Sequence, residues 1–170
     1  EEKLGGVPRY VIPAFRISDE ALDKDVALME RLGVEVKCGA PAPSVAELKK
    51  MGYTHILLAT GAWQAGELGI PGNVRGVIAW MKEMKQQVKP CLEGHVVVVG
   101  AGNTAMDAAR VAKRMGAASS TIVYRRTKKE MPADEHELKL AIDEGVNLVE
   151  LAAPVEQKDG KLICNQMKLG

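Results

Sequence analysis

The residues best suited to chemistry form a glycine-rich turn. Its sequence fits the pattern G-x-G-x-x-[GA] and runs Gly100-Ala101-Gly102-Asn103-Thr104-Ala105. The pattern is common by itself, but here it follows a run of valines and precedes a stretch with helical spacing, as a dinucleotide site requires. We expect Gly100 to permit the tight turn and Gly102 to let a pyrophosphate approach the backbone, facing the first N–H groups of the helix. A purely structural turn between a strand and a helix is the alternative.

Two arginines, Arg125 and Arg126, follow the next predicted strand. NAD-binding proteins place an acidic residue there, which accepts a hydrogen bond from the ribose 2′-hydroxyl. Guanidinium groups would instead match the 2′-phosphate of NADPH, which a carboxylate would repel. The sequence therefore predicts NADPH, with a solvated pair of surface arginines as the alternative. Lys128 and Lys129 in the following loop either add positive charge or are simply solvated.

The elements that must position these residues alternate between strands and helices. In the second half, strands are predicted at 96–99, 121–124 and 146–151, helices at 104–115 and 134–144, and a hairpin around Asp159-Gly160. In the first half, helices are predicted from Ser18 to Gly33, from Ser44 to Gly52 and from Val77 to Val88, with strands at 34–37 and 53–59. This order predicts the α/β class, with a doubly wound Rossmann-type unit and a parallel sheet.

Composition argues against several classes of function. Lys and Arg total 23 against 22 for Asp and Glu, so no basic field indicates nucleic acid or an anionic membrane. No apolar run approaches the ~18 residues that span a bilayer. The three cysteines and three histidines are scattered, which argues against a disulfide framework and against a metal site. We therefore expect a cytoplasmic protein that binds neither metal nor nucleic acid nor membrane.

Several segments, in order along the chain, resemble one known family. They are residues 5–16 (GGVPRYVIPAFR), 58–62 (LATGA), 69–72 (GIPG), 98–107 (VVGAGNTAMD), 124–126 (YRR) and 130–132 (EMP). Together they extend over nearly the whole chain and resemble the small chain of glutamate synthase, a family of FAD- and NADPH-dependent oxidoreductases. Within it, residues 103–107 and 130–133 are most similar to the large flavoprotein subunit of the selenate reductase type.

The resemblance implies two dinucleotide-binding units that hold different cofactors. FAD would bind the first unit and NADPH the second, and electrons would pass from flavin through iron–sulfur centres to a partner domain or subunit. Carried over by position, the pyrophosphate would be held by Gly100, Ala101, Gly102, Asn103 and Thr104, and the 2′-phosphate by Arg125 and Arg126. Glu137 matches a glutamate near the NADPH ribose, with a helix-surface carboxylate as the alternative. No catalytic side chain is expected, because hydride transfer depends on positioning.

The resemblance also implies a domain organisation. Residues 1–68 would be a remnant of the FAD-binding domain, 69–93 a linking segment, and 94–170 the NADPH-binding Rossmann domain, expected to be truncated at its C-terminus. FAD itself is not expected in this segment, because the first G-x-G-x-x-G motif is missing. The alternative function is a non-catalytic Rossmann shell that docks within a larger electron-transfer complex. An NAD-linked dehydrogenase of a small substrate is disfavoured, because neither a second domain nor a catalytic base is visible.

Overall fold

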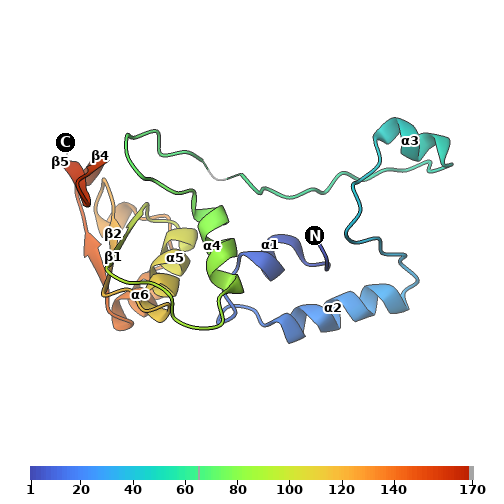
Figure 1. Ribbon diagram of the computed structural model, residues 1–170, viewed down its shortest axis with the longest axis horizontal. Coiled ribbons are helices and arrows are strands. Elements are labelled where there is room, and N and C mark those ends of the chain that lie inside the picture. Colours follow the sequence, from blue (N-terminus) through green and yellow to red (C-terminus); the bar gives the residue numbers. More distant parts are fainter. Residues whose placement is uncertain (65, 169–170) are drawn as a thin grey trace. The chain divides into compact units, whose positions relative to one another are not determined.

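The computed structural model describes residues 1–64 and 66–168. The chain divides into two compact units, Glu1–Gln64 and Ala65–Gly170. Figure 1 shows the helices and strands of both units, coloured along the chain.

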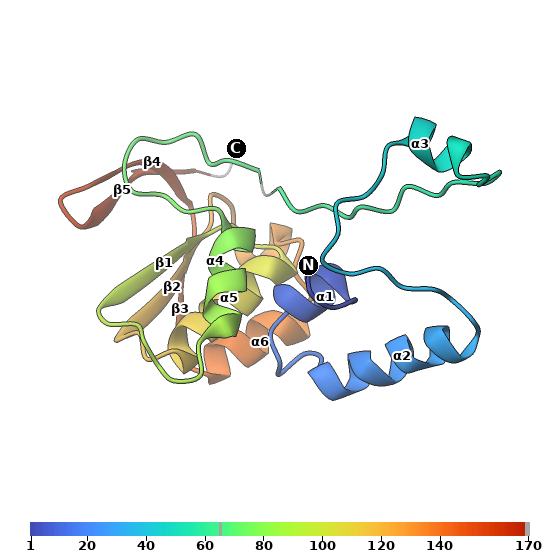
Figure 2. The ribbon, with the colours of Figure 1, turned by 45° about the vertical axis from the view of Figure 1, so that its right-hand side comes forward.

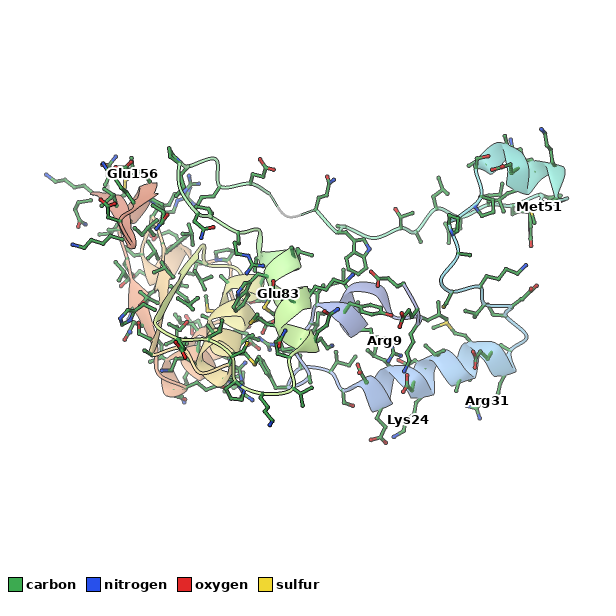
Figure 3. The ribbon with its side chains drawn as sticks, viewed as in Figure 1. Arg9, Lys24, Arg31, Met51, Glu83 and Glu156 are labelled. Atoms are coloured by element: carbon green, nitrogen blue, oxygen red, sulfur yellow. The ribbon has the colours of Figure 1, made fainter. Side chains whose placement is uncertain are left out.

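The first unit contains three helices, α1 (Gly6–Tyr10), α2 (Asp19–Arg31) and α3 (Val45–Lys50). As predicted, α2 begins at a serine cap, where the Ser18 hydroxyl accepts the N–H of Ala21 at 3.2 Å. Arg9, on α1, is buried and places Nη2 2.6 Å from Asp23 of α2 (Figure 3). This ion pair fastens α1 to α2.

The two strands predicted in the first unit are wrong. Residues 34–37 and 53–59 are irregular and join no sheet, and residues 1–64 contain no strand. Leu57 is 90% exposed and Leu58 71% exposed, although their apolar run predicted a buried strand. A strand needs a neighbour to receive its N–H and C=O groups. Since this unit offers none, hydrophobicity alone does not produce a strand.

The second unit is built on a parallel sheet. Its strands are β1 (His95–Val99), β2 (Ser119–Val123) and β3 (Val146–Val149), in the order β1-β2-β3. The connecting helices α5 (Asn103–Arg114) and α6 (Glu135–Asp143) lie along the same face of the sheet (Figure 2). Helix α4 (Val77–Gln86) packs against α5. These elements confirm the predicted α/β, Rossmann-type unit.

Small side chains bring α5 close to the sheet. Met106 and Ala109 of α5 are fully buried together with Ile122 of β2 and Ala141 of α6. Alanine is small, so at such positions it lets the backbones of a helix and a strand approach closely. The start of α5, which follows the glycine-rich turn, thereby packs against the strand that precedes the arginines.

A hairpin follows the sheet. Strands β4 (Ala152–Lys158) and β5 (Lys161–Gln166) pair antiparallel around Asp159 and Gly160, whose φ values are both positive at 49° and 73°. Positive φ at both central residues is the tight-turn geometry that Asp-Gly predicts. The third strand ends at Val149 rather than Leu151, because Leu151 has φ 55° and turns the chain into β4. In the described part of the chain, no helix is long and apolar enough to cross a membrane.

Candidate functional site

The turn after β1 needs glycine at its first position for conformational reasons. Gly100 has φ 127°, a backbone geometry that side chains rarely adopt. Its N–H donates to the carbonyl of Val123 at 3.1 Å, which joins the turn to the end of β2. Ala101 and Ala105 are almost fully buried on either side of the turn. The structure therefore gives Gly100 the tight-turn role that the sequence predicted.

The backbone at Gly102, unlike that at Gly100, has a conformation that any residue can adopt. Its φ of −87° and ψ of 172° are extended values open to any residue, and a Cβ built there meets no atom within 4 Å. Neither the conformation nor the packing of the chain requires glycine at this position. The open space beside the backbone is therefore available to a ligand, as the dinucleotide motif predicts.

The first turn of α5 carries unused hydrogen-bond donors. Gly102 has no side chain to cap the helix, and its carbonyl accepts the N–H groups of Ala105 and Met106 at 2.8 and 3.2 Å. Among the described residues, no group accepts from the N–H groups of Gly102, Asn103 or Thr104. Such donors, with the partial positive charge of a helix start, suit an anion.

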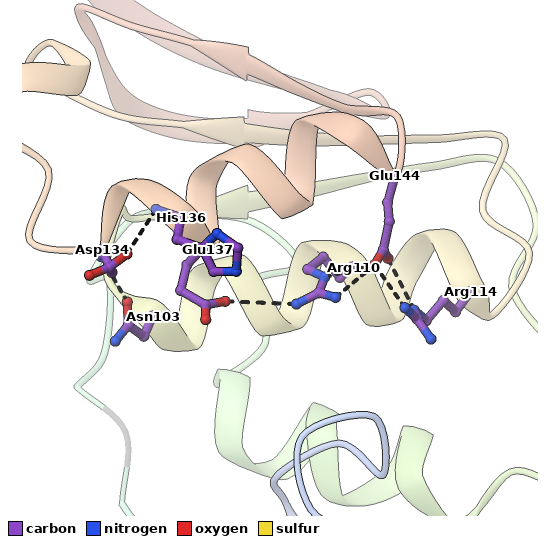
Figure 4. Close-up of polar contacts among 7 residues, drawn as sticks. All are labelled: Asn103, Arg110, Arg114, Asp134, His136, Glu137 and Glu144. Atoms are coloured by element: carbon purple, nitrogen blue, oxygen red, sulfur yellow. Dashed lines mark hydrogen bonds and ion pairs between the residues drawn. The ribbon is translucent and has the colours of Figure 1, made fainter.

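The Asn103 side chain ties this turn to α6. Its Oδ1 accepts the N–H of Asp134 at 3.2 Å, and Asp134 in turn caps α6 through the N–H of His136 at 2.8 Å. A parallel bond runs from the N–H of Ala133 to the carbonyl of Ala101 at 3.1 Å. In Figure 4 the amide nitrogen of Asn103 points away from Asp134. Sequence reasoning assigned Asn103 to the pyrophosphate but missed this contact between loops.

Arg125 and Arg126 are exposed and follow β2 after one intervening residue, Tyr124. Val99 at the end of β1 is paired in register with Val123 at the end of β2. Because the two strands are parallel, their carboxyl ends meet at one edge of the sheet, where ligands bind in open α/β folds. The structure thus brings the glycine-rich turn and the two arginines to the same edge. Lys128 belongs to the short 3-10 helix η1 (Lys128–Glu130) just beyond.

Glu137 lies on α6 in a network of ion pairs (Figure 4). Its carboxylate is 3.7 Å from the guanidinium of Arg110, a buried residue of α5. Arg110 and Arg114 both contact Glu144 at 2.7 Å. Hydrogen bonds, first from Arg114 and then from Arg110, lower the pKa of Glu144 to about 2 against the opposing effect of burial.

This network was not predicted from the sequence. The arginines lie four residues apart on α5, and Glu137 of α6 lies seven residues before Glu144, the C-cap of that helix. These spacings put each pair on one helical face. That pattern indicates charge on two faces but not that the faces meet. The network has a structural role, because Arg110 is buried and joins two helices. Glu137 is only 16% exposed, so its carboxylate is held by Arg110 rather than freely solvated.

Comparison with known proteins gives a consistent set of relatives. A family model described as pyridine nucleotide-disulphide oxidoreductase matches residues 18–166. The Escherichia coli K12 protein named "Putative oxidoreductase YgfK" is 38% identical, with 100% of this chain and 17% of the relative aligned. The NADPH-Fe(3+) oxidoreductase subunit beta of Geobacter sulfurreducens is 36% identical, with 84% of this chain and 22% of the relative aligned. The glutamate synthase (NADPH) small chain of Azospirillum brasilense is 32% identical, with 90% and 36% aligned.

Solved structures show the same fold. FprA of Mycobacterium tuberculosis, solved in complex with NADPH, gives a TM-score of 0.67 at 15% identity, over 94% of this chain and 57% of FprA. A 2-naphthoyl-CoA reductase gives 0.68 at 15% identity, over 91% of this chain and 23% of the reductase. At these identities the likeness concerns the fold alone.

The alignments cover only part of each relative. The chain spans between 17% and 36% of the lengths of the three curated relatives. The finer resemblance to flavoprotein subunits of the selenate reductase type stays a prediction. Because the family model matches most of the chain and glutamate synthase small chains align with 90% of it, the chain belongs to the pyridine nucleotide-disulphide oxidoreductase family, in its glutamate-synthase-small-chain-like branch.

Proposed function

We propose that the second unit of this chain binds NADPH in an FAD-dependent oxidoreductase. One observation carries the proposal: an open, uncapped helix start and two exposed arginines share one edge of a parallel sheet. Two of the three curated relatives are named for NADPH, which favours the same nucleotide here. When the complete enzyme holds both cofactors, the chemistry they supply is hydride transfer from nicotinamide to flavin.

The pyrophosphate is assigned to the start of α5. Backbone N–H groups of Gly102, Asn103 and Thr104 would donate to it, and the missing side chain at Gly102 leaves the room it needs. Gly100 and Ala101 shape the turn that presents these donors, because the first supplies the positive φ and the second is buried beneath it. An anion here also benefits from the helix dipole.

The 2′-phosphate is assigned to Arg125 and Arg126. Their guanidinium groups offer planar, charge-assisted hydrogen bonds that a carboxylate at the same position could not provide. Glu137 is assigned to the NADPH ribose, with its carboxylate oriented by Arg110 at 3.7 Å. No side chain of this unit is assigned a proton or an electron to carry, because the reaction needs positioning and the exclusion of water.

We also propose the domain organisation that the resemblance to glutamate synthase small chains implies. Residues 1–68 would belong to an FAD-binding domain, 69–93 would link it to the second domain, and 94–170 would form the NADPH domain. The division of the chain into Glu1–Gln64 and Ala65–Gly170 supports the first boundary. We further propose that the complete protein passes electrons to an iron–sulfur domain or subunit. The designation of one relative as a subunit beta and another as a small chain supports such an assembly.

The decisive experiment is a calorimetric titration of the full chain with NADPH and, separately, with NADH. Saturable binding of one NADPH per chain, tighter than the binding of NADH, is the expected result. A folded chain that shows no saturable binding of either nucleotide would contradict the proposal. It would favour instead a non-catalytic Rossmann shell that docks within a larger electron-transfer complex.

A further inference from the structure

Residues 124–130, the arginine loop, are fastened through their backbone to the corner between β3 and β4. The N–H of Ala152 donates to the carbonyl of Tyr124 at 3.0 Å, and the N–H of Leu151 donates to the carbonyl of Arg126 at 3.1 Å. The Tyr124 hydroxyl closes the loop on itself by donating to the carbonyl of Glu130 at 2.8 Å. The backbone of the loop is therefore held at both ends, while both arginine side chains are exposed.

The acidic side chains around this loop contact its backbone. Oε2 of Glu130 accepts the N–H of Thr127 at 2.9 Å and the Thr127 hydroxyl at 2.6 Å. The carboxylate of Glu150, just after β3, accepts the N–H of Lys128. Among the described residues, neither carboxylate forms an ion pair with either arginine. Both guanidinium groups therefore stay available to an external anion, although negative charge lies nearby.

The contact between Glu130 and Thr127 favours an ionised carboxylate. The hydrogen bond from the Thr127 hydroxyl, followed by the one from its N–H, lowers the pKa of Glu130, and the charge of Arg126 makes the smallest contribution. Thr127 directly follows the two arginines, and Glu130 ends η1. Their contact thus closes a four-residue turn at the point where the arginine side chains leave the backbone.

We propose that Thr127 and Glu130 are positioning residues that hold the arginine loop in the geometry that selects NADPH over NADH. The inference rests on the proposed function and adds to it the part of the chain that sets specificity. A loop already ordered before binding does not lose that conformational freedom when the phosphate arrives, so the arginines bind it more tightly. NADH makes no contact through a 2′-phosphate and gains nothing from this order.

Three variants of the full chain test the inference. Thr127→Ala removes the hydroxyl that binds Glu130, whereas Thr127→Ser keeps it. Ser44→Ala is the matched control, because Ser44 and Glu47 make the same pair of contacts, at 2.8 and 2.7 Å, at the start of α3 in the other unit. Each variant is titrated with NADPH and with NADH, and its thermal unfolding is followed to establish that it is folded.

We expect the loss of the Thr127 hydroxyl to weaken the binding of NADPH but not that of NADH. Thr127→Ala should weaken NADPH binding about fivefold, the equivalent of one lost cap, while NADH binding stays within about twofold. Thr127→Ser and Ser44→Ala should keep the preference of the original chain. A folded Thr127→Ala variant that keeps the full preference, or that weakens both nucleotides equally, would overturn the inference. Equal affinities of the original chain for the two nucleotides would instead overturn the proposed 2′-phosphate site, and this inference with it.

Discussion

The side-chain oxygen of Asn103 accepts the backbone N–H of Asp134 at 3.2 Å, which joins the first residue of α5 to the residue that caps α6. Because the donor is a backbone N–H, the atom that faces it must be the amide oxygen, and the amide nitrogen is left as a donor on the other side. One side chain can therefore fix the distance between two loops and offer a hydrogen bond to a phosphate.

Substitutions of Asn103 should separate these two roles. Asn103→Asp keeps an oxygen for Asp134 and suits a helix start, so stability should change little, but its charge should weaken NADPH binding by about tenfold or more. Asn103→Ala loses the bond to Asp134 and should reduce the free energy of unfolding by about 1 kcal/mol. Denaturant unfolding and nucleotide titration measure the two effects. If Asn103→Asp binds NADPH as tightly as the original chain, the pyrophosphate lies elsewhere.

Substitutions of the two glycines in the turn should affect different properties of the chain. At Gly102 we expect a loss of NADPH binding, and at Gly100 a loss of stability. Gly102→Val should fold normally, since an extended backbone and empty space accept a β-branched side chain, yet it should lose NADPH binding because the side chain fills the proposed pyrophosphate position. Gly100→Val should reduce stability by roughly 1–3 kcal/mol, because φ of 127° is strained for valine. Circular dichroism melts and calorimetry distinguish the two. Unchanged NADPH affinity in a folded Gly102→Val variant would refute the assignment.

Glu144 should make stability depend on pH in the acidic range. Its pKa is about 2 in the folded chain, below the ordinary value of 4.5, so the stabilisation is complete above about pH 4.5 and is lost as the pH falls toward 2. Glu144→Gln should therefore lower the free energy of unfolding by roughly 1–3 kcal/mol at pH 7, and the difference from the original chain should shrink on acidification.

A matched control for that experiment lies next to Glu144. Asp143 makes an exposed pair with Lys139 at 3.2 Å, and exposed pairs contribute about 0–1 kcal/mol. Asp143→Asn should thus change stability little at any pH. Chemical denaturation at several pH values between 3 and 7 measures both variants. A constant difference between Glu144→Gln and the original chain across this range would show that ionisation of Glu144 is not the cause.

The sequence predicted the second unit well because local and long-range signals agree there. The valines of β1, the alternation of helix and strand, and Asp159-Gly160 each specify an element that finds its partner in the same unit. In the first unit the apolar run at Leu57 and Leu58 predicted a strand from hydrophobicity alone, and no neighbouring strand was there to complete it. A strand is specified by its neighbours as much as by its own residues.

The candidate site was predictable in its parts but not in its connections. The glycine pattern and the arginines lie where the motif places them, because strand order and parallel pairing fix that edge of the sheet. The Asn103–Asp134 bond and the Arg110–Glu144 pair depend on how α5 and α6 pack together. Spacing along one helix gives the face of a residue, but only tertiary packing gives its partner.

Replacement of both arginines should remove the preference for NADPH. The nucleotides differ by one phosphate, which carries close to two negative charges at neutral pH. Charge-assisted hydrogen bonds from Arg125 and Arg126 contribute about 1.5–3 kcal/mol each before solvent exposure is discounted. Since both side chains are exposed, a net preference of roughly 2–3 kcal/mol is expected, or about 30- to 150-fold in affinity.

The double variant Arg125→Ala/Arg126→Ala should erase most of that preference and leave the affinity for NADH nearly unchanged, because only the 2′-phosphate loses its partners. In the original chain the preference should also shrink as salt rises, since exposed charges are screened over about 10 Å at 0.1 M salt. Titration of both nucleotides at two ionic strengths measures these effects. Lys49→Ala/Lys50→Ala, which removes two exposed positive charges from α3, controls for net charge. A double arginine variant that still discriminates between the nucleotides would show that other groups select the cofactor. A lysine control that loses discrimination equally would show that overall charge, rather than these two guanidinium groups, selects it.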